Sequence, residues 1–208
     1  MKILLLGSGG REHAFGHQLS KSPNCEHLYI APGNGGTGDC GENVSLAIDD
    51  FPALAAFCLE KGVEMIVPAS EAPLVAGIYD YFLADPRLSS IAVIGPSKAA
   101  AQLEGSKAFA KAFMERNAIP TAGYREFTVA ELEEGKRYLE GQALPIVLKA
   151  DGLAAGKGVV ICASVEEAKQ EMEEMLASAK FGAAGSKVVV EDFLTGIECS
   201  VFVLTDGE

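Results

Sequence analysis

The residues of this sequence whose types and spacing could do chemistry are two lysines and three glycines in one short stretch. They are Lys149, Gly152, Gly156, Lys157 and Gly158. Glycine lets backbone N–H groups approach a phosphate without a side chain in the way, and lysine supplies positive charge. Apolar runs of strand length, 145–148 and 159–162, stand on either side. The pattern predicts two antiparallel strands joined by a glycine-rich loop that covers a phosphate-rich ligand, with an ordinary surface hairpin as the alternative.

The stretch does not match the Walker A loop. That loop needs four residues between its glycines, a Ser or Thr after its lysine to bind magnesium, and a helix next. Here three residues separate Gly152 from Gly156, a glycine follows Lys157, and the next residues favour a strand. The sequence therefore excludes a P-loop at this position.

A second glycine-rich turn, at 7–10, follows an apolar run over 2–6 and precedes a predicted helix from Arg11 to about residue 21. Strand, glycine turn and helix together point backbone N–H groups at an anion. The dinucleotide fingerprint, however, would place its third glycine where Glu12 stands, and the second strand (28–31) ends without the acidic residue that holds a ribose. The sequence predicts a Rossmann-like unit that does not bind NAD.

His13 and His17 stand four residues apart on that first helix, which is a possible spacing for metal ligands. No third ligand is evident, and the order H-E-x-x-H is absent because Glu12 precedes His13. We therefore predict structural or solvent-facing roles for both histidines, and no metal site.

Strands and helices alternate through about residue 95. Further strands are predicted over 63–67 and 91–94, with helices over 52–61 and from about residue 73. A loop with four glycines, 31–38, follows the second strand. Because the carboxyl ends of parallel strands share one edge of the sheet, both glycine-rich loops are expected at the ligand-binding edge of a parallel α/β domain.

The rest of the chain predicts a smaller α+β unit. Helical sequence covers 97–117, and Gly105 is expected to split it so that Lys107 begins the second helix. Capping boxes (Thr128 with Glu131, and Ser164 with Glu167) precede two more helices. Strands are predicted over 187–190 and 197–204. We expect four segments: a Rossmann-like N-terminal domain (1–103), a helical connection (104–124), a lid subdomain (125–194) and the start of a further half (195–208).

Composition excludes several classes of partner. The net charge is -12, from 17 Lys and Arg against 29 Asp and Glu, and no basic stripe is present. Nucleic-acid and anionic-membrane binding are disfavoured because both need a positive surface. The five cysteines form no C-x-x-C pair, and the first apolar run is too short for a signal peptide or a membrane span. These features predict a cytoplasmic protein with small-molecule ligands and leave its oligomeric state open.

Several motifs occur together and in order. They are GSGGREH at 7–13, APGN at 31–34, QLEGSK at 102–107, KADGLAAGKGV at 149–159 and EDFL at 191–194. With this set the chain resembles, over its whole length, the phosphoribosylamine–glycine ligase family of ATP-grasp enzymes. The resemblance implies ATP-dependent ligation of glycine to 5-phosphoribosylamine through glycyl phosphate, with Mg²⁺ or Mn²⁺, in purine biosynthesis. The products would be glycinamide ribonucleotide, ADP and phosphate, without a covalent protein nucleophile.

The resemblance also assigns residues. Lys149 and Lys157 would be the catalytic lysines, Glu191 and the backbone of 193–194 would meet the adenine, and Glu198 the ribose. The nucleotide-binding set is then Lys107, Lys149, Gly152, Gly156, Lys157, Gly158, Glu191, Phe193, Leu194 and Glu198. The phosphoribosylamine side would be lined by Gly9, Gly10, Arg11, Gly33, Asn34, Thr37 and Glu71.

The chain departs from the family pattern in two places. The family carries Val-Gly-Pro-Glu-x-Pro-Leu after its third strand, whereas the turn before Glu71 here is one residue longer and lacks the glycine. The family also continues past residue 208 into the part that holds its metal ligands. We therefore expect an N-terminal portion that is inactive alone. Another ATP-grasp carboxylate–amine ligase and a non-catalytic nucleotide-binding fragment are the alternatives.

Overall fold

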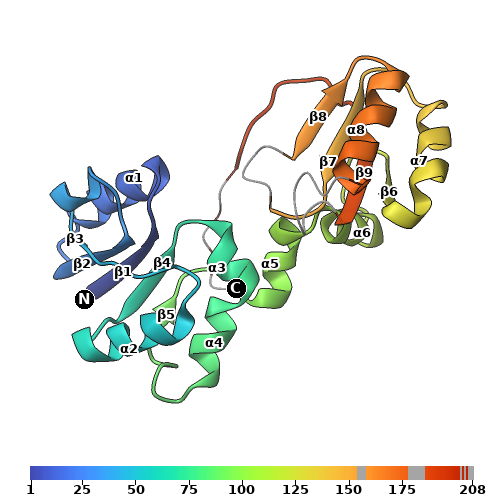
Figure 1. Ribbon diagram of the computed structural model, residues 1–208. Coiled ribbons are helices and arrows are strands. Elements are labelled where there is room, and N and C mark those ends of the chain that lie inside the picture. Colours follow the sequence, from blue (N-terminus) through green and yellow to red (C-terminus); the bar gives the residue numbers. More distant parts are fainter. Residues whose placement is uncertain (154–157, 178–185, 202, 204, 206–208) are drawn as a thin grey trace. The chain divides into compact units, whose positions relative to one another are not determined.

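The structure, a computed structural model, describes residues 1–153, 158–177, 186–201, 203 and 205. The chain divides into two compact units, Met1–Phe113 and Met114–Glu208. Figure 1 shows a sheet with its own helices in each unit. The predicted combination of a parallel α/β domain with a smaller α+β unit is confirmed.

The first unit is built on a five-stranded parallel sheet. In spatial order its strands are β3 (Glu42–Asn43), β2 (His27–Pro32), β1 (Lys2–Gly7), β4 (Met65–Pro68) and β5 (Ala92–Val93). Every neighbouring pair is parallel, and Leu4 of β1 lies opposite Tyr29 and Ile66. Both faces of β1 are covered, which explains why its sequence is a continuous apolar run rather than an alternating one.

Helices cover both faces of this sheet. On one face lies α1 (Gly10–Leu19), and on the other lie α2 (Phe51–Lys61) and α4 (Ile78–Ala84). The chain also forms α3 (Glu71–Ala76), α5 (Lys98–Gly105) and α6 (Lys107–Arg116), with a 3-10 turn, η1, at Thr37–Asp39. Leu4 packs in one core with Leu54 of α2 and Phe82 of α4. Leu5 points to the other face, beside Gly16 of α1. Helix α6 begins in the first unit and ends in the second.

The second unit contains a four-stranded antiparallel sheet in the order β6-β9-β7-β8. The strands are β6 (Tyr124–Thr128), β9 (Lys187–Asp192), β7 (Ile146–Ala150) and β8 (Val159–Cys162). A 3-10 turn, η2 (Val129–Glu131), leads into α7 (Leu132–Leu139), and α8 (Val165–Ala177) follows β8. The antiparallel pairing of β7 with β8 confirms the predicted hairpin.

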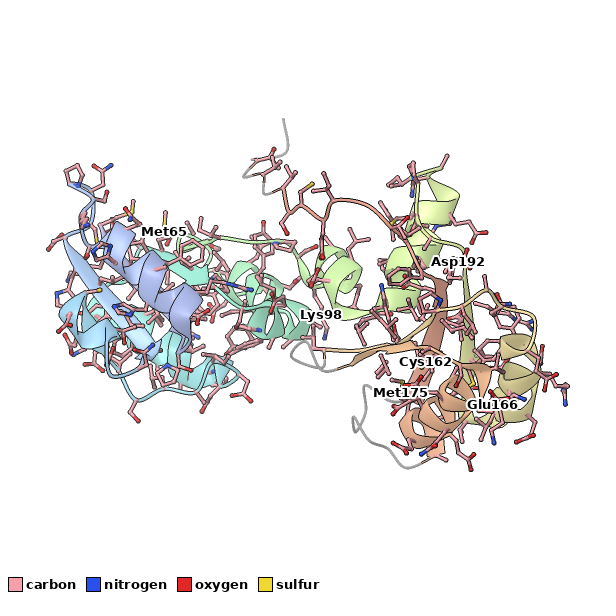
Figure 2. The ribbon with its side chains drawn as sticks, turned by 90° about the horizontal axis from the view of Figure 1, so that it is seen from above. Met65, Lys98, Cys162, Glu166, Met175 and Asp192 are labelled. Atoms are coloured by element: carbon pink, nitrogen blue, oxygen red, sulfur yellow. The ribbon has the colours of Figure 1, made fainter. Side chains whose placement is uncertain are left out.

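One face of this second sheet forms the core of the unit. Leu148 of β7 and Val190 of β9 are buried with Met172 of α8. Figure 2 labels two further members of this core, Cys162 of β8 and Met175 of α8. Because side chains alternate along a strand, the residues between these positions belong to the opposite face.

Helix ends in this unit follow the predicted capping boxes. Glu131 Oε2 accepts hydrogen bonds from the Thr128 backbone N–H (2.9 Å) and hydroxyl (2.7 Å). Before α8, the Ser164 hydroxyl accepts the Glu167 N–H at 3.2 Å, and the Glu167 carboxylate accepts the N–H of Ala163 at 2.7 Å. Both boxes satisfy amides that have no acceptor within their helices.

Two sequence predictions about the elements are wrong. The helix expected from about residue 73 is two helices, because Gly77 adopts a left-handed φ of 102° between α3 and α4. The strand expected over 197–204 is absent from the described residues of that range, where no described strand pairs with it. A strand needs a hydrogen-bonding neighbour, and an apolar alternating pattern alone does not provide one.

The burial of the Leu148 face of this sheet can be tested by mutation. Replacement Leu148→Ala empties a core position and should lower the free energy of unfolding of the second unit by about 2–5 kcal/mol. Ile161→Ala, on the other face of the same sheet, is the control and should change it by no more than about 0.5 kcal/mol, because Ile161 is exposed. Urea unfolding followed by far-ultraviolet circular dichroism measures both. Equal losses would contradict the assignment of the core to the Leu148 face.

Candidate functional site

In the first unit the two glycine-rich loops meet at the carboxyl edge of the parallel sheet. The Gly33 N–H donates to the Gly7 carbonyl at 3.1 Å. The Asn34 side-chain amide donates to the Ser8 carbonyl at 2.9 Å and to the Gly9 carbonyl at 3.3 Å. The sequence prediction that both loops share this edge is therefore met by direct hydrogen bonds between them.

Asn34 and Thr37 hold the second loop together. Asn34 Oδ1 accepts the N–H groups of Gly36 (2.8 Å) and Thr37 (3.1 Å). The Thr37 hydroxyl accepts the Asn34 N–H at 2.7 Å and lies 2.7 Å from Asn43 Oδ1. Thr37 is fully buried. These two side chains are used inside the loop, so their contribution to a ligand site is to fix the loop backbone.

Gly33 is a position that requires glycine. Its φ of +74° lies in the left-handed region, and an added Cβ would lie 2.8 Å from the Thr37 hydroxyl oxygen. The same crowding involves Asn43, which sequence reasoning missed. Asn43 belongs to the two-residue strand β3, which is too short to leave a periodic pattern in the sequence.

Arg11 and Glu71 form an ion pair at the same edge. Arg11 Nη1 donates to Glu71 Oε1 and to the Ala69 carbonyl, both at 3.0 Å. Both side chains are more than one-third exposed. The longer turn before Glu71 thus supplies a carbonyl that binds the guanidinium, and Glu71 becomes the first residue of α3.

The surroundings of Glu71 favour its charged form. The backbone N–H of Glu71 itself is the main cause that lowers the pKa of its carboxyl, and the Arg11 guanidinium lowers the pKa further, while burial opposes both. The Glu71 carboxylate in turn raises the pKa of Arg11. The edge therefore carries a charged Arg11–Glu71 pair, and Gly9 and Gly10 of the same edge are both exposed.

In the second unit, Lys149 and Glu191 are joined on the face of the sheet opposite the core. Lys149 Nζ lies 2.9 Å from Glu191 Oε2. In the register, Lys149 faces Val189 and Val147 faces Glu191, so the two charged residues are diagonal neighbours on β7 and β9. The Lys149 side chain is 29% exposed and that of Glu191 is 7% exposed. Two residues from separate motifs thus form one charged centre.

Tyr124 extends this charged face along β6. It lies directly opposite Glu191 in the antiparallel register. The Tyr124 hydroxyl donates to Glu115 Oε2 at 3.2 Å, and burial, followed by this hydrogen bond, raises the pKa of the phenol. Sequence reasoning missed Tyr124, because only the β6–β9 register brings it beside Glu191.

The other predicted nucleotide residues are distributed over both units. Lys107 is the first residue of α6. Gly152 follows β7 and Gly158 directly precedes β8, and the Ala150 N–H donates to the Gly158 carbonyl at 2.7 Å. Gly156 and Lys157 lie outside the described residues. Phe193, Leu194 and Glu198 follow β9 and are exposed.

The part of the chain that the structure describes contains no group of three His, Cys, Asp or Glu side chains arranged to hold a metal ion. His13 packs on the second loop, since a Cβ at Gly36 would lie 2.7 Å from its Cε1, and His17 is exposed. Within the same residues no helix is long and apolar enough to cross a membrane.

Comparison with known proteins matches the chain to two domains of one family. The family model of the phosphoribosylglycinamide synthetase N domain matches residues 1–104, and the model of the ATP-grasp (A) domain of the same synthetase matches residues 105–208. The parallel sheet followed by the lysine-bearing hairpin is therefore that of an ATP-grasp protein. The chain belongs to the phosphoribosylglycinamide synthetase family, as its motifs predict.

Individual relatives agree with this assignment. The chain is 49% identical to phosphoribosylamine–glycine ligase of Vibrio parahaemolyticus and 46% identical to that of Escherichia coli, across all of this chain and 48% of each relative. The crystal structure of the Thermotoga maritima ligase gives a TM-score of 0.74 at 34% identity, over 95% of this chain and 45% of that one. The N5-carboxyaminoimidazole ribonucleotide synthetase from Thermus thermophilus is similar in fold alone, with a TM-score of 0.61 at 22% identity over 93% of this chain and 47% of that one. The chain spans about half the length of the curated relatives it matches.

The Arg11–Glu71 ion pair is expected to affect proton binding by the Glu71 carboxylate. Titration of the Glu71 carboxyl carbon by NMR should give a pKa below its usual value. Arg11→Gln should raise that pKa only part of the way back, because the larger cause, the Glu71 N–H, remains. Lys21→Gln removes an exposed positive charge from the end of α1 and should leave the pKa of Glu71 unchanged. An unchanged Glu71 pKa in Arg11→Gln would show that the ion pair does not form in solution.

Proposed function

We propose that this chain is the ATP-binding and acceptor-binding part of a phosphoribosylamine–glycine ligase, which joins glycine to 5-phosphoribosylamine in purine biosynthesis. The observation that carries the proposal is the Lys149–Glu191 pair on β7 and β9, in a chain similar over its full length to ligases of that name. The products are glycinamide ribonucleotide, ADP and phosphate. The five cysteines are all free, which suits the reducing cytoplasm in which we place the reaction.

The second unit is proposed to bind ATP. Lys149 is held on a rigid strand, partly shielded from water, where a positive charge acts on phosphates more strongly than in bulk solvent. Glu191 is an acceptor for the adenine amino group, since a carboxylate accepts hydrogen bonds from such donors. Lys157 would add positive charge at the phosphates, while Lys107, which lies in the first unit, stays an assignment from the family resemblance. The exposed residues after β9 (Phe193, Leu194 and Glu198) would meet the adenine and ribose.

The first unit is proposed to bind phosphoribosylamine. Gly9 and Gly10 are exposed beside Arg11, whose guanidinium is suited to a phosphate. The Glu71 carboxylate, in its charged form, is suited to an amine or to hydroxyl groups of the sugar. Gly33, Asn34 and Thr37 act by fixing the second loop, which their hydrogen bonds and burial support.

The chemistry needs no protein nucleophile. Transfer of the γ-phosphoryl group of ATP to the glycine carboxylate makes an acyl phosphate, and the amine of phosphoribosylamine then displaces phosphate to form the amide. The protein's part is to position the reactants and to neutralise developing phosphate charge. Mg²⁺ or Mn²⁺ would supply further charge neutralisation, and we place its protein ligands in the part of the relatives that this chain does not span.

Calorimetric titration with MgATP tests the nucleotide assignment. Lys149→Gln keeps a donor for Glu191 but removes the positive charge, and should weaken MgATP binding by roughly tenfold or more, the size of one hydrogen bond to a charged group. Lys169→Gln removes a lysine that pairs with Glu140 on the helical side of the same unit, and should bind MgATP as the unaltered chain does. Failure of the unaltered chain to bind, or equal binding by Lys149→Gln, contradicts the assignment.

A further inference from the structure

Glu12 lies in the first turn of α1, where the dinucleotide fingerprint has its third glycine. Only 6% of the residue is exposed. The carboxylate folds back toward the turn before the helix, and Oε2 accepts a 2.5 Å hydrogen bond from the Gly9 backbone N–H. An acidic group at the N-terminal end of a helix is stabilised by the helix dipole as well as by such a bond.

The glycines of the turn are arranged around this carboxylate. A Cβ atom at Gly7 would lie 2.6 Å from Glu12 Cδ, and one at Gly9 would lie 2.8 Å from Glu12 Oε2. A Cβ atom at Gly10, by contrast, would have no heavy atom within 4 Å. The inner side of the turn is therefore filled by the carboxylate of the protein itself, while the outer side, at Gly10, is open.

This arrangement limits which anion the turn can bind. In dinucleotide-binding proteins the pyrophosphate approaches the second glycine at the helix N-terminus. Here the N–H of that glycine, Gly9, is already bonded to a carboxylate, and a phosphate placed beside it would meet a like charge. The N–H groups of Gly10 and Arg11 have no acceptor within the helix and can serve one phosphate.

We propose that Glu12 is a positioning residue that determines specificity. Its carboxylate reserves the Gly9 N–H, so that the turn accepts a ligand with a single phosphate group at Gly10 and rejects a pyrophosphate. The inference rests on the proposed function, in which the first unit binds a phosphate-bearing amine, and adds the residue that sets how many phosphates fit.

NMR of the ¹⁵N-labelled chain, titrated with inorganic phosphate and with inorganic pyrophosphate, tests this inference. In the unaltered chain, phosphate should shift the Gly10 amide, and neither anion should shift the Gly9 amide. In Glu12→Ala, pyrophosphate should shift Gly9, and the affinity for pyrophosphate relative to phosphate should rise roughly tenfold, the value of one hydrogen bond to a charged group. Glu12→Gln retains an acceptor for the Gly9 N–H but has no charge, so its affinity for pyrophosphate relative to phosphate should rise by less than in Glu12→Ala. Glu26→Gln, an exposed carboxylate of the same unit, is the control.

A purely structural role for Glu12 would weaken the binding of both anions together, so a gain for pyrophosphate alone is the distinguishing result. The proposal is overturned if pyrophosphate shifts the Gly9 amide equally in the unaltered chain and in Glu12→Ala. It is also overturned if Glu12→Ala gains no affinity for pyrophosphate relative to phosphate. If Glu12→Ala does not fold, absence of any gain in Glu12→Gln overturns it instead. If phosphate does not shift the Gly10 amide in the unaltered chain, the phosphate site of the proposed function is refuted. The shift of the Gly9 amide with pyrophosphate tests the role of Glu12 independently of that site.

Discussion

The two-residue alternation of β7 and β9 is the constraint on which the second unit depends. Because of this alternation, Leu148 and Val190 lie in the core, and Lys149 and Glu191 lie on the opposite face of the sheet. A carboxylate as buried as Glu191 is costly unless a positive group lies beside it, and Lys149 Nζ at 2.9 Å provides that group. A nucleotide that binds there must compete with this contact. The same strands thus stabilise the unit and hold its charged centre in a fixed place.

In the first unit the constraint is different, because glycine-rich backbone must be held in one conformation. Glycine allows close approach to a ligand but costs conformational entropy on folding. Side chains offset that cost: Glu12 binds the Gly9 N–H, and Asn34 binds carbonyls of the first loop and N–H groups of the second. The loops are therefore ordered by polar side chains beneath them. This leaves Gly10 and Arg11 as the groups that face outward.

Much of the fold could be predicted from the sequence, because buried parallel strands and capped helices leave local patterns. The run over 2–6, the β7–β8 hairpin and the Thr128 capping box are examples. What could not be predicted depends on a backbone conformation, on the shortness of an element or on distant partners. The split at Gly77 depends on a backbone conformation, β3 is too short to have a period, and residues 197–204 carry a strand pattern without a described neighbour.

The same distinction holds for the site. Lys149 and Glu191 can each be chosen from their motifs, but the register that joins them across 42 residues of sequence cannot. Thr37 can be chosen as a site residue from its loop, whereas its complete burial and its hydrogen bonds to Asn34 and Asn43 cannot be predicted from the sequence.

ATP and the phosphate-bearing acceptor are proposed to bind to different units of this chain. The most direct test compares backbone amide shifts of the ¹⁵N-labelled chain on addition of MgATP and of ribose 5-phosphate, a stable relative of phosphoribosylamine. MgATP should shift residues of β7 and β9 around Lys149 and Glu191, and ribose 5-phosphate should shift Gly10 and Arg11. Separate binding on the two units is contradicted if both compounds shift the same set of residues, or if each shifts the set assigned to the other.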